Sequence, residues 1–123
     1  MSFVRSEAVA VTTNSSGEST TYSTGTYNGL LQAIHYQRSS TGTAMSTGMV
    51  LTVSGEVSGI TYLTRTVTDT SDLTYMPRGR THYSTSGAES GGENQLPVCQ
   101  ERIKFVTSSG GSAKTGTFRI VVI

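Results

Sequence analysis

The strongest constraint on the fold is a period of two among the apolar residues in the middle of the chain. Within residues 49–57, Met49, Leu51, Val53 and Val57 fall on one face, and they alternate with Val50, Thr52, Ser54 and Glu56. Successive side chains of a β-strand point to opposite faces. The segment is therefore predicted to be a strand with one buried face.

A short turn follows this strand. Ser58-Gly59 has the composition of a two-residue hairpin turn, and it leads into a second strand predicted over residues 60–67. This turn would set Gly55 opposite Tyr62, whose ring is expected to lie across the glycine.

The same alternation predicts strands elsewhere in the chain. They are expected over residues 3–11, 30–37, 73–76, 81–83, 102–107 and 118–122. The last two are expected to form a hairpin, because a register with Phe105 opposite Ile120 and Ile103 opposite Val122 puts all four side chains on one face. Polar loops are expected at 39–48, 84–95 and 108–117.

Composition supports an all-β chain. Val, Ile, Thr, Tyr and Phe number 46, whereas the strong helix formers Ala, Leu, Glu, Lys, Gln, Met and Arg number 35. Ser, Thr and Gly make up 53 of the 123 residues, with Thr in the strands and Ser and Gly in the loops. We expect residues 1–123 to form a single domain, an antiparallel β-sandwich or barrel of about eight short strands joined by long Ser/Gly loops.

Residues 12–28 stand apart because they contain no aliphatic side chain. The segment is expected to be an extended arm or a polar hairpin. Tyr22 and Tyr27 are its only large side chains, so they are candidate contacts with a partner protein.

Charge narrows the range of partners. Nine Lys and Arg against eight Asp and Glu leave a net charge of +1, which argues against a nucleic-acid binder. No apolar run is long enough to span a membrane, and no secretory signal precedes the first strand. The last 23 residues are locally basic, and their cations are candidate protein contacts: Arg102, Lys104, Lys114 and Arg119.

The core is thin and has no covalent support. Leu, Ile, Val and Phe total only 25 residues, and Cys99 is the single cysteine, so there is no internal disulfide. Cys99 is expected to be a small buried side chain. A thin core favours burial against neighbours, so a homo-oligomer or a larger assembly is expected.

Segments that resemble reactive sites have simpler interpretations. Residues 110–116 resemble a phosphate-binding loop, but Ala113 stands where the motif requires glycine, and a strand follows. His35 and His82 lack an identifiable nucleophile, and a turn explains the two aspartates in 69–72 better than a calcium site does. We therefore assign no catalytic, cofactor-binding or metal-binding residue and expect no enzymatic activity.

Arg78 and Arg80 are the most distinctive charged pair. Two residues apart on an extended segment, they would project from the same side. Such a pair suits carboxylates on a partner protein, or it keeps an exposed sheet edge from aggregating.

Three stretches resemble small β-rich structural proteins that tailed bacteriophages encode near their capsid genes: residues 51–59, 74–82, and 101–105 with 111–118. The similarity spans roughly Leu51 to Ile123. It implies a virion protein that decorates or cements the capsid by binding the major capsid protein, on the surface of a particle assembled in the host cytoplasm. A head–tail or tail component and a carbohydrate-binding sandwich module, with tyrosines stacked on sugars, are the alternatives.

Overall fold

Alternating side chains form β-strands over most of the chain. The computed structural model describes residues 4–39, 43–67, 72–82 and 86–123, except for the side chains of Arg80, Thr81, His82 and Ser90. The strands are β1 (Arg5–Thr12), β2 (Ser19–Tyr22), β3 (Tyr27–Arg38), β4 (Met49–Gly55), β5 (Thr61–Val67), β6 (Leu73–Tyr75), β7 (Arg78–His82), β8 (Glu89–Glu101), β9 (Ile103–Ser108) and β10 (Thr115–Val122). The described residues contain no helix.

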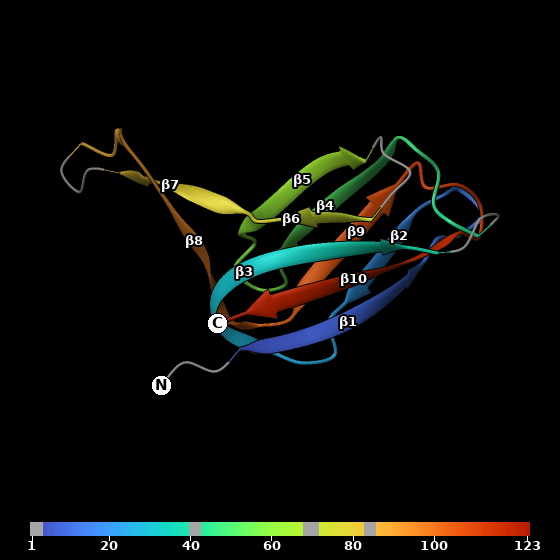
Figure 1. Cartoon of the computed structure of the whole chain (residues 1–123), viewed down its shortest axis with the longest axis horizontal. Helices are drawn as coiled ribbons and strands as arrows, with labels where there is room; N and C mark the ends of the chain where they lie inside the picture. The colour runs from blue at the N-terminus through green and yellow to red at the C-terminus, as the bar shows by residue number, and fades with distance from the viewer. Residues whose placement is uncertain (1–3, 40–42, 68–71, 83–85) are drawn as a thin grey trace.

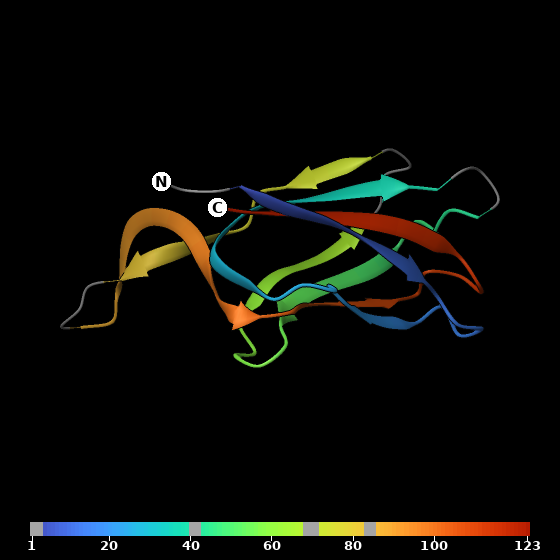
Figure 2. The ribbon, with the colours of Figure 1, turned by 90° about the horizontal axis from the view of Figure 1, so that it is seen from below.

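The strands form two antiparallel sheets that face each other (Figures 1 and 2). The six-stranded sheet has the order β1-β10-β3-β8-β7, with β6 also paired to β3, and the four-stranded sheet has the order β2-β9-β4-β5. The prediction of an all-β antiparallel sandwich is confirmed. Neither sheet closes into a barrel.

The core lies between the sheets and contains a short stack of aromatic rings. Phe118 of β10 lies 4.9 Å from Tyr36 of β3 and 5.3 Å from Phe105 of β9, measured between ring centroids. All three rings are at most 1% exposed. Offset aromatic stacking adds about 0.5–1.5 kcal/mol per pair to the free energy of area burial.

The predicted hairpin between the last two strands is wrong. β9 pairs with β2 and β4, whereas β10 pairs with β1 and β3. Phe105 and Ile120 are both buried in the same core, but they belong to opposite sheets. A period of two shows which face of a strand is buried, and two facing sheets satisfy it as well as two neighbouring strands do.

The turn after β4 also differs from the prediction. Val57 is 82% exposed, and the strand ends at Gly55, whose N–H donates to the carbonyl of Ile60 at 2.9 Å. A methyl group on Gly55 would fall on the carboxylate of Glu101. The glycine therefore makes room for a buried glutamate. Because a register shift pairs Val53 with Leu63 and Ser54 with Thr61, Gly55 is not opposite Tyr62 as predicted.

Residues 12–28 belong largely to the sandwich. β2 pairs with β9 over four residues, and Tyr27 begins β3 with only 7% of its surface exposed. The segment is thus not a free arm.

Two further expectations were wrong. Residues 89–95, expected in a loop, form the first half of β8. Cys99 is exposed, because in β8 it is Val98 that points into the core.

The β7–β8 hairpin extends beyond the sandwich (Figure 1). The half of β8 from Leu96 to Glu101 pairs with β3, whereas its outer half pairs only with β7, with Arg78 opposite Gln95. A two-stranded ribbon without a core of its own is marginally stable in water. The outer part of the hairpin is therefore the region most in need of support from outside the sandwich.

Candidate protein-interaction surface

The outer face of the six-stranded sheet carries an apolar row at the end where the hairpin leaves the sandwich. The row crosses four neighbouring strands or their ends: Val4 precedes β1, Ile123 follows β10, Leu30 lies in β3 and Pro97 in β8. Leu30 and Ile123 exchange main-chain hydrogen bonds of 2.8 and 2.9 Å. Leu30 is also opposite Pro97, and Val4 continues the β1–β10 register to Ile123.

All four side chains of this row point away from the core. Val4 is 68% exposed, Leu30 41% and Ile123 36%, and Pro97 is also exposed. The outer face of an antiparallel sandwich sheet is ordinarily polar. An apolar row in this place, which we call the outer row, therefore marks a candidate contact surface.

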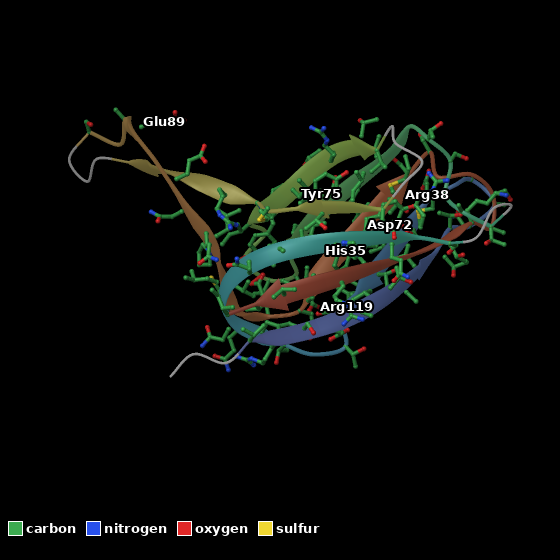
Figure 3. All side chains as sticks on the ribbon, viewed as in Figure 1. His35, Arg38, Asp72, Tyr75, Glu89 and Arg119 are labelled. Carbon is green, nitrogen blue, oxygen red and sulfur yellow. The ribbon has the colours of Figure 1, made fainter. Side chains whose placement is uncertain are left out.

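The middle of this outer face carries a row of one small side chain, one arginine and one histidine. Ala8 in β1, Arg119 in β10 and His35 in β3 lie side by side across the sheet, and Figure 3 shows Arg119 and His35 on neighbouring strands. His35 shares a 2.8 Å hydrogen bond with Thr74. Arg119 is exposed and has no ion pair with any residue that the structure describes. The face thus offers a partner apolar contacts and one uncompensated positive charge.

Arg78 does not project from the hairpin as the sequence led us to expect. Its guanidinium Nη1 donates to the carbonyls of Pro77 at 2.7 Å and Gln32 at 3.2 Å. It ties the base of the hairpin to β3. Arg80 lies in β7 opposite Glu93, but its side chain is outside the described residues.

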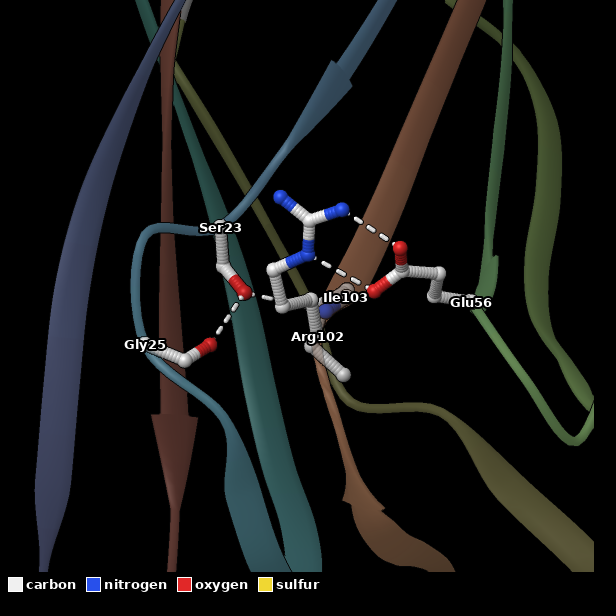
Figure 4. Close-up of polar contacts among 5 residues, drawn as sticks. All are labelled: Ser23, Gly25, Glu56, Arg102 and Ile103. Atoms are coloured by element: carbon white, nitrogen blue, oxygen red, sulfur yellow. Dashed lines mark hydrogen bonds and ion pairs between the residues drawn. The ribbon is translucent and has the colours of Figure 1, made fainter.

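A polar cluster around Arg102 and Glu56 lies beside the four-stranded sheet (Figure 4). Arg102 Nε donates to Glu56 Oε2 at 2.7 Å, and its Nη2 makes a second bond of 2.5 Å to Oε1. The guanidinium lies 4.5 Å from the ring centroid of Tyr22. Hydrogen bonding to Arg102 lowers the pKa of Glu56, and the same bond raises the pKa of Arg102.

The buried hydroxyl of Ser23 aligns the strands next to this cluster. It accepts a hydrogen bond from the N–H of Ile103 at 2.9 Å and donates one to the carbonyl of Gly25 at 2.8 Å (Figure 4). The cluster therefore sits at a fixed junction of β2 and β9. Because Arg102 and Tyr22 are already paired with each other, they offer a partner less than the exposed Arg119 does.

Tyr27 has a structural partner in Glu7. Its hydroxyl donates to Glu7 Oε1 at 2.7 Å, and the N–H groups of Thr24 and Gly25 donate to the same carboxylate at 2.6 and 3.0 Å. Burial tends to raise the pKa of Glu7, but these hydrogen bonds outweigh it and leave the pKa lowered. Burial, together with the bond to Glu7, raises the pKa of Tyr27 to about 12.

The remaining predicted contacts are scattered. Lys104 is half-buried on the outer side of β9, opposite Tyr22. Lys114 precedes β10, where its N–H donates to the hydroxyl of Thr13 at 2.8 Å. Of the seven predicted contact residues whose side chains the structure describes, only Tyr22, Arg102 and Lys104 lie together, on the face opposite the outer row.

The loop that resembles a phosphate-binding motif uses its amides internally. The N–H groups of Gly110, Ala113 and Thr115 donate to the carbonyls of Gly17, Asn14 and Thr43. A phosphate cradle needs amides that point together into open space. This loop instead fastens the β1–β2 connection to the start of β10.

The tyrosines do not form a sugar-stacking platform. The rings of Tyr27, Tyr36 and Tyr62 are buried, those of Tyr22 and Tyr75 are half-buried, and Tyr83 lies outside the described residues. The carbohydrate-binding alternative therefore has no exposed ring among the five tyrosines that the structure describes.

The described residues contain neither a metal-binding cluster nor a membrane-spanning helix. No group of three or more His, Cys, Asp or Glu side chains is placed to hold a metal ion. No helix is long and apolar enough to cross a membrane. Asp69 lies outside the described residues, and Asp72 accepts a 2.9 Å hydrogen bond from the N–H of Arg38.

Comparisons of the chain with protein-family models, with curated proteins and with solved structures found no match.

The outer row is the feature that sequence reasoning missed, although the sequence contains a signal for it. Leu30 and Leu31 are adjacent, and Val121, Val122 and Ile123 are consecutive. Because a strand turns neighbouring side chains to opposite faces, only one of two adjacent apolar residues can point into the core. Such doublets predict an apolar outer face.

Proposed function

We propose that this chain is a non-enzymatic structural protein of a bacteriophage virion, which decorates or cements the capsid by bridging capsid subunits. The resemblance of residues 51–118 to small phage structural proteins suggests the setting. The outer row, Val4, Ile123, Leu30 and Pro97, is the observation that carries the proposal, because it supplies a binding surface on a rigid sandwich.

The outer row suits repeated weak contacts. Full burial of one Val, Leu or Ile side chain contributes about 1.5–3 kcal/mol. These side chains are already partly covered, so the row supplies only a few kcal/mol before the cost of association is subtracted. A capsid presents the same site many times, and many modest contacts hold a lattice together when each copy touches more than one subunit.

Charge narrows the chemistry of the capsid partner. Arg119 is exposed on the same face as the row, and none of the neighbouring outer side chains in β1, β3 and β10 is acidic. A surface of the major capsid protein that combines apolar side chains with a carboxylate would complement this face.

The proposal is tested by binding to empty capsid shells. The wild-type protein should cosediment with shells and raise the temperature at which they break. Val4→Lys combined with Leu30→Lys should abolish cosedimentation, because two ammonium groups would have to be buried. Thr117→Lys combined with Gln37→Lys is the matched control, because this pair lies on the same face at the other end of the sheet.

Two results would contradict this function. One is wild-type protein that neither binds shells nor changes their heat resistance. The other is equal binding by the Val4/Leu30 variant and the wild type. In images of whole particles, density for this chain at a single vertex would favour a head–tail or tail component over a decoration protein.

A further inference from the structure

β1 is an open edge of the six-stranded sheet. Among the strands that the structure describes, its eight residues pair only with β10, and the register runs from Arg5–Val122 to Thr12–Thr115 without a shift. A regular edge strand is a template for another strand unless a bulge, a proline or an exposed charge protects it. β1 contains no bulge and no proline.

The register shows which main-chain groups of β1 are free. Thr13 N–H donates to the carbonyl of Lys114 at 2.8 Å, directly beyond the end of the ladder. Hydrogen-bonded and non-bonded pairs alternate in an antiparallel ladder. The odd-numbered residues of β1 therefore bond to β10, and the N–H and C=O groups of Ser6, Ala8, Ala10 and Thr12 point to the open side.

The other edge of β10 supports this assignment. Ile123 and Leu30 exchange two main-chain hydrogen bonds, so the odd-numbered residues of β10 bond to β3. The even-numbered residues of β10 are then left for β1, and they stand opposite the odd-numbered residues of β1. The two ends of the ladder give the same alternation.

Both charged side chains of β1 have bonding partners elsewhere in the chain. The carboxylate of Glu7 is occupied by Thr24, Gly25 and Tyr27. Arg5 Nη2 donates to the carbonyl of Asn28 at 3.2 Å, and its guanidinium lies 5.9 Å from the ring centroid of Tyr27. The charged side chains that could discourage strand addition are thus bonded to the link between β2 and β3 or to the first residues of β3.

The side chains at the open edge leave room for close approach. Ser6, Ala8, Ala10 and Thr12 are all small and exposed. By contrast, the β5 edge of the other sheet is paired through a register shift near Val53 and Ser54, and it carries the exposed Arg65. Among these sheet edges, β1 has the longest unprotected run of regular pairing.

We propose that two copies of this chain associate through β1, which pairs antiparallel with β1 of the second copy about a twofold axis at Val9. Ala8 of each copy then lies opposite Ala10 of the other, and Ser6 lies opposite Thr12. Every open main-chain group of Ser6, Ala8, Ala10 and Thr12 finds a partner in this register. The occupant is a second copy because the open edge is complementary to itself in both main-chain pattern and side-chain size.

The arrangement has a consequence for the outer face. A twofold axis perpendicular to the joined sheet keeps the outer faces of both copies on the same side, so a dimer presents two outer rows to one partner surface. The dimer itself does not depend on the proposed function, because its interface is the edge and not the face.

The first test measures association in solution. We expect the wild-type protein to show a concentration-dependent monomer–dimer equilibrium by sedimentation. Ala8→Lys should raise the dimer dissociation constant at least about tenfold, because it places a charge at the paired edge. Thr117→Lys, on the neighbouring strand but away from the edge, should leave the constant within about twofold. Circular dichroism of both variants checks that the sandwich is intact.

The second test reports the register and requires no loss of binding. With Cys99→Ser as the background, Ala8→Cys and Ala10→Cys proteins are mixed and oxidised gently. Directly opposite residues lie within disulfide range, whereas diagonal ones about 7–8 Å apart do not. A disulfide-linked dimer should therefore form in the mixture and not with either protein alone.

Three outcomes would overturn the inference. They are a wild-type protein that stays monomeric at every concentration, an unchanged dissociation constant for Ala8→Lys, and crosslinking that is equal in the mixture and in the single proteins. Shell binding is measured separately. A failure to bind shells would therefore not contradict a dimer through β1, and a monomeric protein would not contradict binding to the capsid.

Discussion

The contact between Gly55 and Glu101 predicts a stability effect whose sign depends on the background. Glu101 is 2% exposed, and its carboxylate accepts hydrogen bonds of 2.9 Å from both the N–H and the hydroxyl of Ser58. A Cβ atom on Gly55 would overlap this carboxylate and lie 2.6 Å from the Ser58 hydroxyl oxygen. Gly55 does not have a positive φ, so alanine can adopt its backbone conformation.

The expected change in the free energy of unfolding follows from the hydrogen bonds that Gly55→Ala would weaken. Hydrogen bonds to a charged group contribute about 1.5–3 kcal/mol each, and displacing the carboxylate weakens two of them. Replacing a strand glycine by alanine returns about 0.5–1 kcal/mol. We therefore expect Gly55→Ala to lower the free energy of unfolding by about 2–4 kcal/mol. In a Glu101→Ala background the obstacle is gone, and the same substitution should be neutral or stabilising.

Urea denaturation of the wild type, both single variants and the double variant measures this coupling. Unchanged m-values among the four proteins would show that the unfolded state is comparable. The reasoning is refuted if Gly55→Ala shifts the free energy of unfolding by the same amount in both backgrounds. It is also refuted if the substitution is harmless in the wild type.

Three further predictions address pH, backbone geometry and exposure. Hydrogen bonds lower the pKa of Glu7 from its ordinary value of 4.5, so the ionised carboxylate stabilises the fold above that pH and this stabilisation is lost as the pH falls through the lowered pKa. The difference in thermal midpoint between the wild type and Glu7→Gln should therefore shrink on acidification. A difference that stays constant with pH would contradict this prediction. Gly29→Ala should destabilise the protein more than Gly59→Ala does. Both glycines have a positive φ, but only at Gly29 would a Cβ also clash with the main chain of Ile123. Equal losses of unfolding free energy in chemical denaturation would show that the clash is relieved. Cys99 should react with a thiol reagent in the folded protein without denaturant, and labelling that begins only on unfolding would contradict its exposure.

The fold class could be predicted from the sequence because it depends on local patterning. Alternation located Met49, Leu51 and Val53 on the buried face of β4, and all three are fully buried. In β1 the same alternation puts Val9 and Val11 on the buried face and leaves Ala8 exposed. These assignments require only the period of a strand.

Strand partners were predicted poorly because pairing is not a local property. Phe105 and Phe118 stack across the interior from different sheets, and nothing in their spacing separates that arrangement from a hairpin. The buried Glu101 was overlooked for a related reason. Its partner Ser58 lies 43 residues away, and the composition of the turn gave no sign that a carboxylate fills the space beside Gly55.

The candidate contacts were chosen by charge, and the structure shows why charge was a weak guide. Arg78 and Arg102 are already bonded to a carbonyl or a carboxylate of the same chain. The surface that stands open is instead apolar at Leu30 and Ile123 and small along β1. An unbonded side chain is recognised only when its neighbours are known.

The pairing of β1 with β10 has a consequence for folding during synthesis. β1 leaves the ribosome before its neighbour β10, with eight strands between them in the sequence, and β3 must also wait for β10. Loop closure over such a distance is slow compared with local pairing. The nascent chain must therefore carry β1 as an unpaired strand until β10 has been made. In a cell that makes many copies at once, contacts between the unpaired β1 strands of unfinished chains are a hazard, which the translation rate and chaperones have to limit.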